Sequence, residues 1–234
     1  MIHILTLKVG TKYSSNVVNN LYKELKYHST TPFKFWCYTE NKKGLDPDIK
    51  IINLTNPEKY KLQWHKVKFH KTNFANIPMG DDCIIMDIDM KILQDVDAIL
   101  NFPINKNEFG CVYRWWSDRT HQCPINGGFQ KFKMGSSNMI WKLFEEKPDF
   151  WQPYYINRGE AFGPVNGEQN FIHNHIEAIG LKRKYLPLEW FGKHNENLLE
   201  NYIKPLWNQK VSKEPYMKDN NFNKNIKIIH YSNG

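Results

Sequence analysis

Two aspartates, Asp87 and Asp89, stand two residues apart directly after an apolar run that ends at Met86. Side chains at positions i and i+2 of an extended backbone point the same way, so the two carboxylates are expected to converge at the end of a strand. Adjacent carboxylates repel each other unless a cation joins them. A hard divalent ion such as Mn²⁺ or Mg²⁺ takes oxygen ligands and is readily shared with phosphate oxygens. The spacing therefore predicts a metal site, and a turn in which both aspartates cap a following helix is the alternative.

The elements that precede these aspartates alternate between strands and helices. Continuous or alternating apolar runs predict strands, whereas apolar residues at helical spacing predict helices. These patterns give strands at 2–9, 33–39, 49–54 and 83–86, with helices at about 15–28 and 62–74. The resulting β-α-β-β-α-β order is typical of a parallel or mixed sheet with helices on its faces. In such sheets a site forms at the carboxyl ends of the strands, which is where the two aspartates stand.

The second part of the chain is less regular. The same patterns predict helices at 95–101, 138–146 and 168–179, strands at 109–116, 128–133 and 226–231, an aromatic loop up to Tyr155 and a poorly packed loop over 208–225. The 234 residues are enough for one large domain with its own core.

Charge and cysteine usage narrow the function classes. Lysine and arginine exceed aspartate and glutamate by 32 to 24, a net charge of +8 that suggests polyanionic partners. Only four of the basic residues are arginines, the side chains that most readily make paired hydrogen bonds to phosphates and bases. Coding bias therefore explains the net charge better than a nucleic-acid-binding surface does.

The four cysteines form no CxxC pair and are expected to be buried and reduced. Without an apolar run of about 18 residues or a signal-peptide pattern, a cytoplasmic protein is expected.

Segments spread along the whole chain resemble, in order, those of the nucleotide-sugar glycosyltransferases of the GT-A type. The similarity is to the glycogenin and galactosyltransferase group (family 8) and to small bacterial or viral relatives. The resembling segments are the nucleotide-binding first strand and loop (4–13), the Asp-x-Asp motif (87–89), a stretch like the sugar-pocket motif N-[SA]-G-V-M-L-W (135–141), a helix start like D-Q-D-x-L (167–171), and a terminal strand with a metal-binding histidine (228–231).

This resemblance implies an α/β fold with a GT-A (Rossmann-like) mixed, mainly parallel sheet flanked by helices. It implies a single catalytic domain over 1–234, with a nucleotide-binding half at 1–90 and an acceptor- and sugar-binding half at 91–234. The implied activity is metal-dependent transfer of a sugar from a nucleoside-diphosphate sugar, in the first place a UDP-sugar, to a glycan or a lipid-linked acceptor, with retention of configuration. No nucleic-acid partner is expected, and a lipid-linked acceptor would bring the enzyme into peripheral contact with a membrane.

The resemblance also assigns roles to individual residues. The metal ligands are Asp87, Asp89 and His230, holding Mn²⁺ or Mg²⁺; the donor-binding residues are Thr6, Lys8, Tyr13, Lys66, Asp87, Ser137, Asn138 and Gln169; and the catalytic candidate is Glu168, with Asp118 in reserve. Tyr13 is expected to stack on the base, or alternatively to pack on the sheet. Lys66 is expected to contact phosphate as a point charge. For Lys8, a plain exposed strand lysine is the alternative.

Two departures from the family pattern leave the subfamily and the stereochemistry open. The family's His-x-x-Gly-x-Lys-Pro-Trp ending, with its phosphate-binding lysine, is absent after His230, and Glu168 stands where the family has aspartate. A basic polyanion-binding protein without catalysis is the main alternative, and it predicts binding to nucleic acid that weakens steeply with salt. A sugar-nucleotide pyrophosphorylase would need a Gly-rich, Arg-containing loop after the first strand, where only Gly10 is found. A hydrolase, with water as acceptor, is a further alternative.

Overall fold

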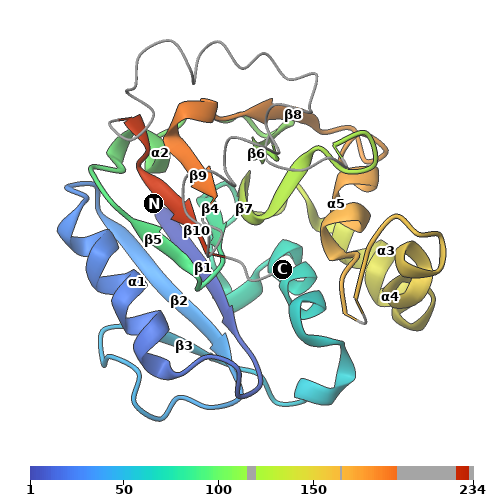
Figure 1. The fold of residues 1–234 in the computed structure, drawn as a ribbon, viewed down its shortest axis with the longest axis horizontal. Coiled ribbons are helices and arrows are strands. Elements are labelled where there is room, and N and C mark those ends of the chain that lie inside the picture. Colours follow the sequence, from blue (N-terminus) through green and yellow to red (C-terminus); the bar gives the residue numbers. More distant parts are fainter. Residues whose placement is uncertain (115–119, 164, 194–224, 232–234) are drawn as a thin grey trace.

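A seven-stranded sheet forms the centre of the computed structural model, which describes residues 1–114, 120–163, 165–193 and 225–231 (Figure 1). The strand order is β3-β2-β1-β4-β7-β6-β8. The strands are β1 (Ile2–Lys8), β2 (Phe33–Thr39), β3 (Lys50–Asn53), β4 (Asp82–Met86), β6 (Glu108–Tyr113), β7 (Ile125–Lys133) and β8 (Lys182–Tyr185). Only β7 runs against its neighbours within this sheet, so the predicted mixed, mainly parallel sheet is confirmed.

The central strands are apolar because both of their faces are covered. Ile4 pairs with Ile84 and Leu5 with Ile85 in the parallel β1–β4 ladder, and all four side chains are fully buried. Such continuous apolar runs are what a sheet buried on both faces requires. The parallel direction places the carboxyl ends of β1 and β4 at the same edge of the sheet.

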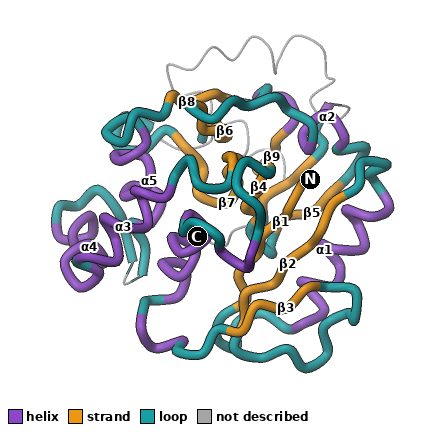
Figure 2. Tube along the Cα trace, turned by 180° about the vertical axis from the view of Figure 1, so that it is seen from behind, coloured by secondary structure: helices purple, strands orange, loops and turns teal. Residues whose placement is uncertain are grey.

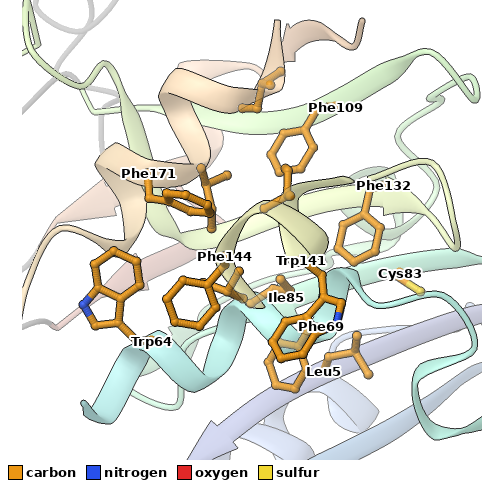
Figure 3. Close-up of a cluster of buried hydrophobic side chains, with 14 of the residues drawn as sticks. Leu5, Trp64, Phe69, Cys83, Ile85, Phe109, Phe132, Trp141, Phe144 and Phe171 are labelled. Carbon is orange, nitrogen blue, oxygen red and sulfur yellow. The ribbon is translucent and has the colours of Figure 1, made fainter. Parts of the chain in front are cut away.

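Helices cover both faces of the sheet, and the sheet separates two hydrophobic cores (Figure 2). One face packs against α1 (Ser15–Tyr27) and the short α2 (Asp97–Leu100). The other face packs against α3 (Asn138–Glu146), α4 (Pro148–Asn157), α5 (Glu168–Ile176) and the 3₁₀ segment η2 (Leu62–His70). The second core is strongly aromatic: Figure 3 shows Trp64, Phe144 and Phe171 gathered between these helices and the sheet.

A small second sheet carries the last described strand. Its order is β5-β10-β9, with β5 at Met90–Ile92, β9 at Phe191–Lys193 and β10 at Ile228–His230 (Figure 1). β10 is antiparallel to β5 and parallel to β9. Because β5 begins directly after the Asp-x-Asp segment, this sheet brings the end of the chain back to the two aspartates.

Several predictions at the level of elements were wrong. The predicted helix at 62–74 is the 3₁₀ segment η2 followed by η3 (Phe74–Asn76), and the positive φ values of Asn73, Ala75 and Asn76 prevent an α-helix from continuing there. The aromatic loop up to Tyr155 is the helix α4, which begins at Pro148, a residue favoured in the first turn. The strands β5, β8 and β9 were not predicted. The remaining 3₁₀ segments are η1 (Pro57–Lys59) and η4 (Leu188–Trp190).

Two further expectations concern the cysteines and membrane spans. All four cysteines are buried and free, as predicted. Across the described part of the chain, no helix has the length and apolar character needed to cross a membrane.

Candidate functional site

Asp87 and Asp89 lie in a tight turn between β4 and β5. The Asp87 N–H donates to the Gly128 carbonyl at 2.9 Å, and the Met90 N–H donates to the Asp87 carbonyl at 3.2 Å. The residues after Asp89 form a strand, so the alternative in which the two aspartates cap a following helix is wrong. The turn instead points both carboxylates at His230, and the nearest ligand atoms of the three residues all lie within 4.8 Å of one another.

His230 presents a buried ring nitrogen to both carboxylates. Its Nε2 atom lies 3.2 Å from Asp89 Oδ1 and 3.8 Å from Asp87 Oδ2, and it makes no well-formed hydrogen bond with any described residue. The other ring nitrogen, Nδ1, lies 3.1 Å from the side-chain amide of Asn126. A buried nitrogen without a hydrogen bond, facing two carboxylates, suits a divalent cation, and the mixed oxygen and imidazole set suits Mn²⁺ better than Mg²⁺.

Tyr13 reaches the site from the loop before α1. Its hydroxyl donates to Asp89 Oδ2 at 3.0 Å, while its ring packs on the core beneath α1. Burial opposes the charged form of Asp89, but His230 and Tyr13 outweigh this effect and lower the pKa of Asp89 to about 2. Asp89 is therefore ionised at neutral pH, which is the state a metal ligand needs.

Lys66 of η2 bridges Asp87 and Glu168. Its Nζ atom lies 2.9 Å from Asp87 Oδ1 and 3.6 Å from Glu168 Oε2, and it donates to the Gly127 carbonyl at 3.4 Å. Burial of this side chain favours the neutral amine, but the charges of Asp87 and Glu168 outweigh it and hold the pKa of Lys66 above its ordinary value. The site thus contains a fixed positive charge next to the carboxylates.

Glu168 and Gln169 begin helix α5 beside this lysine. The helix starts after Gly167, whose φ of +111° is a conformation that side chains rarely adopt. Glu168 is almost fully buried, and burial raises its pKa to about 7 against the opposing charge of Lys66. Gln169 Oε1 accepts the Gly127 N–H at 3.1 Å. A carboxyl group with such a pKa can hold or release a proton near neutral pH.

Two glycines of β7 line the site, and they were not identified from the sequence. A Cβ atom at Gly127 would come within 2.7 Å of Gln169 Cβ, and one at Gly128 within 2.8 Å of His230 Cε1 and 2.9 Å of Asp87 Oδ2. Successive residues of a strand face opposite sides, so the Glu168–Gln169 pair and His230 approach β7 from opposite faces. Paired glycines inside a strand indicate a close approach of other groups, and this signal could have identified them.

Thr6 and Lys8 lie at the carboxyl end of β1, on the edge of the sheet where β4 also ends. Both residues are buried, and Lys8 is only 6% exposed, so the alternative of a plain exposed strand lysine is wrong. The Thr6 hydroxyl is buried and has no hydrogen-bond partner among the described residues.

The structure does not bring every predicted residue to this cluster. The Ser137 hydroxyl is buried and lies 2.8 Å from His70 Nδ1, and Asn138 Oδ1 accepts the Thr72 N–H at 2.9 Å. These hydrogen bonds join the start of α3 to η2 and the segment after it. The stretch beside Asp87 is instead Asn126–Gly128, of which only Gly128 falls in the strand predicted at 128–133. Asp118 lies outside the described residues.

No protein-family model matches the chain, and the search of curated proteins found no match to its sequence. Its structure is similar to that of the galactosyltransferase LgtC in complex with donor and acceptor sugar analogs, with a TM-score of 0.64, 12% identity and coverage of 98% of this chain and 86% of LgtC. It is also similar to the glycosyltransferase GlyE of Streptococcus pneumoniae TIGR4, with a TM-score of 0.64, 9% identity and coverage of 99% and 55%. The bifunctional glycosyltransferase WbbM in its apo form gives a TM-score of 0.61, 11% identity and coverage of 100% and 46%. The chain therefore has the fold of GT-A glycosyltransferases, as predicted.

Proposed function

We propose that this chain is a metal-dependent glycosyltransferase that moves a sugar from a nucleoside-diphosphate sugar to a hydroxyl group of an acceptor. The observation that carries the proposal is the convergence of Asp87, Asp89 and His230 at the end of β4. This convergence occurs in a fold shared with LgtC, which is described with donor and acceptor sugar analogs bound. Neither observation alone would suffice, because Asp-x-Asp motifs are common and one fold hosts many functions.

The reaction needs stabilisation of negative charge on the leaving group. A nucleoside diphosphate becomes more negative as the anomeric bond breaks, and Asp87, Asp89 and His230 would hold a divalent ion that would supply neutralising charge there. The residues around these ligands keep them in place: Tyr13 donates to Asp89, Asn126 contacts the ring of His230, and Lys66 holds Asp87. The protein thereby fixes the ligand geometry before the donor binds.

Glu168 is our candidate for the group that acts on the sugar. The transferred sugar passes through a cationic, oxocarbenium-like state, which a nearby carboxylate stabilises. Glu168 is buried beside Lys66, and the side-chain amide of the adjacent Gln169 accepts a hydrogen bond from the Gly127 N–H. In a retaining reaction Glu168 stabilises the cation, whereas in an inverting reaction it takes the acceptor proton. We favour retention, and Asp118 remains the reserve candidate.

The donor is proposed to lie across the edge of the sheet where β1 and β4 end. Thr6, Lys8 and Tyr13 would contact the nucleoside and phosphates from residues 1–90, and the sugar would face Glu168 in residues 91–234. In line with the family resemblance, we take residues 1–234 as one catalytic unit, UDP as the nucleotide, and a glycan or a lipid-linked molecule as the acceptor. A polyanion-binding protein without catalysis is less favoured, because the residues gathered at this edge include three carboxylates.

Thermal unfolding with nucleotides tests the proposal. The full chain is heated with UDP, GDP, ADP, CDP and UDP-sugars, each with and without Mn²⁺. A ligand that binds the native state at about 100 times its Kd adds about 2.7 kcal/mol of stability. We expect one nucleoside diphosphate to raise Tm and to do so only with Mn²⁺. Asp89→Asn should abolish the Mn²⁺-dependent part, whereas Asp48→Asn, at an exposed surface ion pair, should leave it unchanged. If none of these ligands raises Tm with Mn²⁺ present, the proposal is overturned.

A further inference from the structure

Lys193 is placed next to His230 by the pairing of strands in the small sheet. His230 pairs with Met90 of β5 on one side and with Lys193 of β9 on the other. Paired residues on neighbouring strands project from the same face of a sheet. Since His230 faces Asp87 and Asp89, the side chain of Lys193 projects toward the same side.

Electrostatic effects on Lys193 agree with this placement. Its pKa is lowered to about 8, mainly by burial; Asp89 and then Asp87 oppose this shift, and Arg114 adds to it. The carboxylates of Asp89 and Asp87 and the guanidinium of Arg114 thus all influence the amine electrostatically. Lys193 is only partly exposed, although lysines are usually solvated.

The two lysines near the site, Lys66 and Lys193, lie on opposite sides of β7. Lys66 lies on the face of Glu168, and its charge is shared between Asp87 and Glu168. Lys193 lies on the face of His230, where a Cβ atom at Gly128 would meet His230 and Asp87. Lys193 is therefore a second cation near the metal ligands, distinct from the lysine that compensates Glu168.

We propose that Lys193 binds the diphosphate of a nucleoside-diphosphate ligand, beside the ion held by Asp87, Asp89 and His230. The inference rests on the function proposed above. The two carboxylates offset part of the charge of a bound divalent ion, so a diphosphate beside it is balanced more fully when a further cation is present. A lysine ammonium is a compact point charge that binds phosphate oxygens through up to three donors. The side chain of Lys193 is positively charged, is partly buried, and projects from the same face of the small sheet as His230. Arg114 adds to the positive potential around it.

The test compares diphosphates with monophosphates. Calorimetry on the full chain with Mn²⁺ measures the Kd of UDP, GDP, ADP and CDP, each against its monophosphate, and continues with the nucleotide that binds most tightly. The variants are Lys193→Met, Lys193→Arg and, as a matched control, Lys91→Met. Lys91 belongs to the same small sheet but is exposed on its opposite face.

Lys193→Met should raise the Kd of the nucleoside diphosphate by about 10- to 100-fold, which is the effect of losing a charged hydrogen bond. The Kd of the monophosphate should change by less than about 3-fold. Lys193→Arg should retain most of the affinity, and Lys91→Met all of it. Equal binding by wild type and Lys193→Met, or equal losses for both nucleotides, would overturn the role of Lys193 alone. Failure of the wild type to bind any nucleoside diphosphate would overturn the proposed function as well. If Lys193→Met does not fold, Lys193→Gln and Lys193→Arg decide by the same comparison.

Discussion

The Nζ atom of Lys66 lies 2.9 Å from Oδ1 of Asp87, and the other oxygen of that carboxylate, Oδ2, faces Nε2 of His230 at 3.8 Å. Asp87 thus divides its two oxygens between a permanent cation and the metal cluster. Lys66 also lies 3.6 Å from Glu168, so one buried lysine connects the metal ligands with the candidate catalytic carboxyl group. The position of Asp87 and the charge of Glu168 therefore depend on the same residue.

Replacing Lys66 by methionine should destabilise the metal-free protein. Breaking a buried ion pair leaves an uncompensated charge and costs about 3 kcal/mol or more. Here Asp87 and Glu168 would both lose their nearest cation. Urea unfolding measures the loss, and Lys68→Met is the control on the same 3₁₀ segment, because Lys68 hydrogen-bonds only to the Tyr38 hydroxyl among the described side chains. A Lys66→Met protein as stable as the Lys68→Met control would contradict this account.

Asn126→Ala should weaken Mn²⁺ binding by about 10- to 100-fold, the usual effect of removing a group that orients a metal ligand. The reason is that Asn126 contacts Nδ1 of His230 and so fixes the direction of Nε2. Titration of Mn²⁺ into the purified protein measures the effect. Asn138→Ala is the control: its side chain accepts the Thr72 N–H, so its loss should lower Tm and leave Mn²⁺ affinity unchanged. Equal Mn²⁺ affinities for both variants would argue against the role of Asn126.

Gly128→Ala should abolish Mn²⁺ binding while the protein remains folded. The added methyl group would lie 2.8 Å from His230 Cε1 and 2.9 Å from Asp87 Oδ2, so two of the three ligands must move. Movements of this size exceed the precision that metal coordination allows. Phe129→Leu, at the next position of β7 and on the core, should cost stability but bind Mn²⁺ normally. Normal Mn²⁺ affinity in Gly128→Ala would show that the ligands do not need this space.

The parts of the site that the sequence predicted are those set by local geometry. Asp87 and Asp89 converge because they are two residues apart at the end of a strand, and that spacing is visible in the sequence. The order of strands and helices before them likewise predicted the class of sheet. His230 was found only through a family resemblance, because its approach to the aspartates depends on pairing between β10 and β5, which are far apart along the chain.

The parts that were missed depend on contacts between distant segments. Asn126 and the two glycines after it owe their roles to groups from α5 and β10, which no local pattern displays. Ser137 and Asn138 are assigned to the donor because residues 135–141 resemble the family's sugar-pocket motif. Their hydrogen bonds instead hold η2 and the residues after it. Lys193 could not be chosen among 28 lysines without the register between β9 and β10.

The pH dependence of stability should report the burial of Glu168. Burial, against the charge of Lys66, raises the pKa of Glu168 from 4.5 to about 7, so folding favours its protonated form. The stabilisation is fully present below about pH 4.5 and is lost as the pH rises through 7, on the order of 1–3 kcal/mol. Urea unfolding of the metal-free protein between pH 5 and 8 measures the decline. Glu168→Gln, which stays neutral, should lack this component, whereas Glu160→Gln, at a surface ion pair, should keep it. A decline of the same size in Glu168→Gln would show that Glu168 is already ionised in the folded protein and would assign the effect to another group.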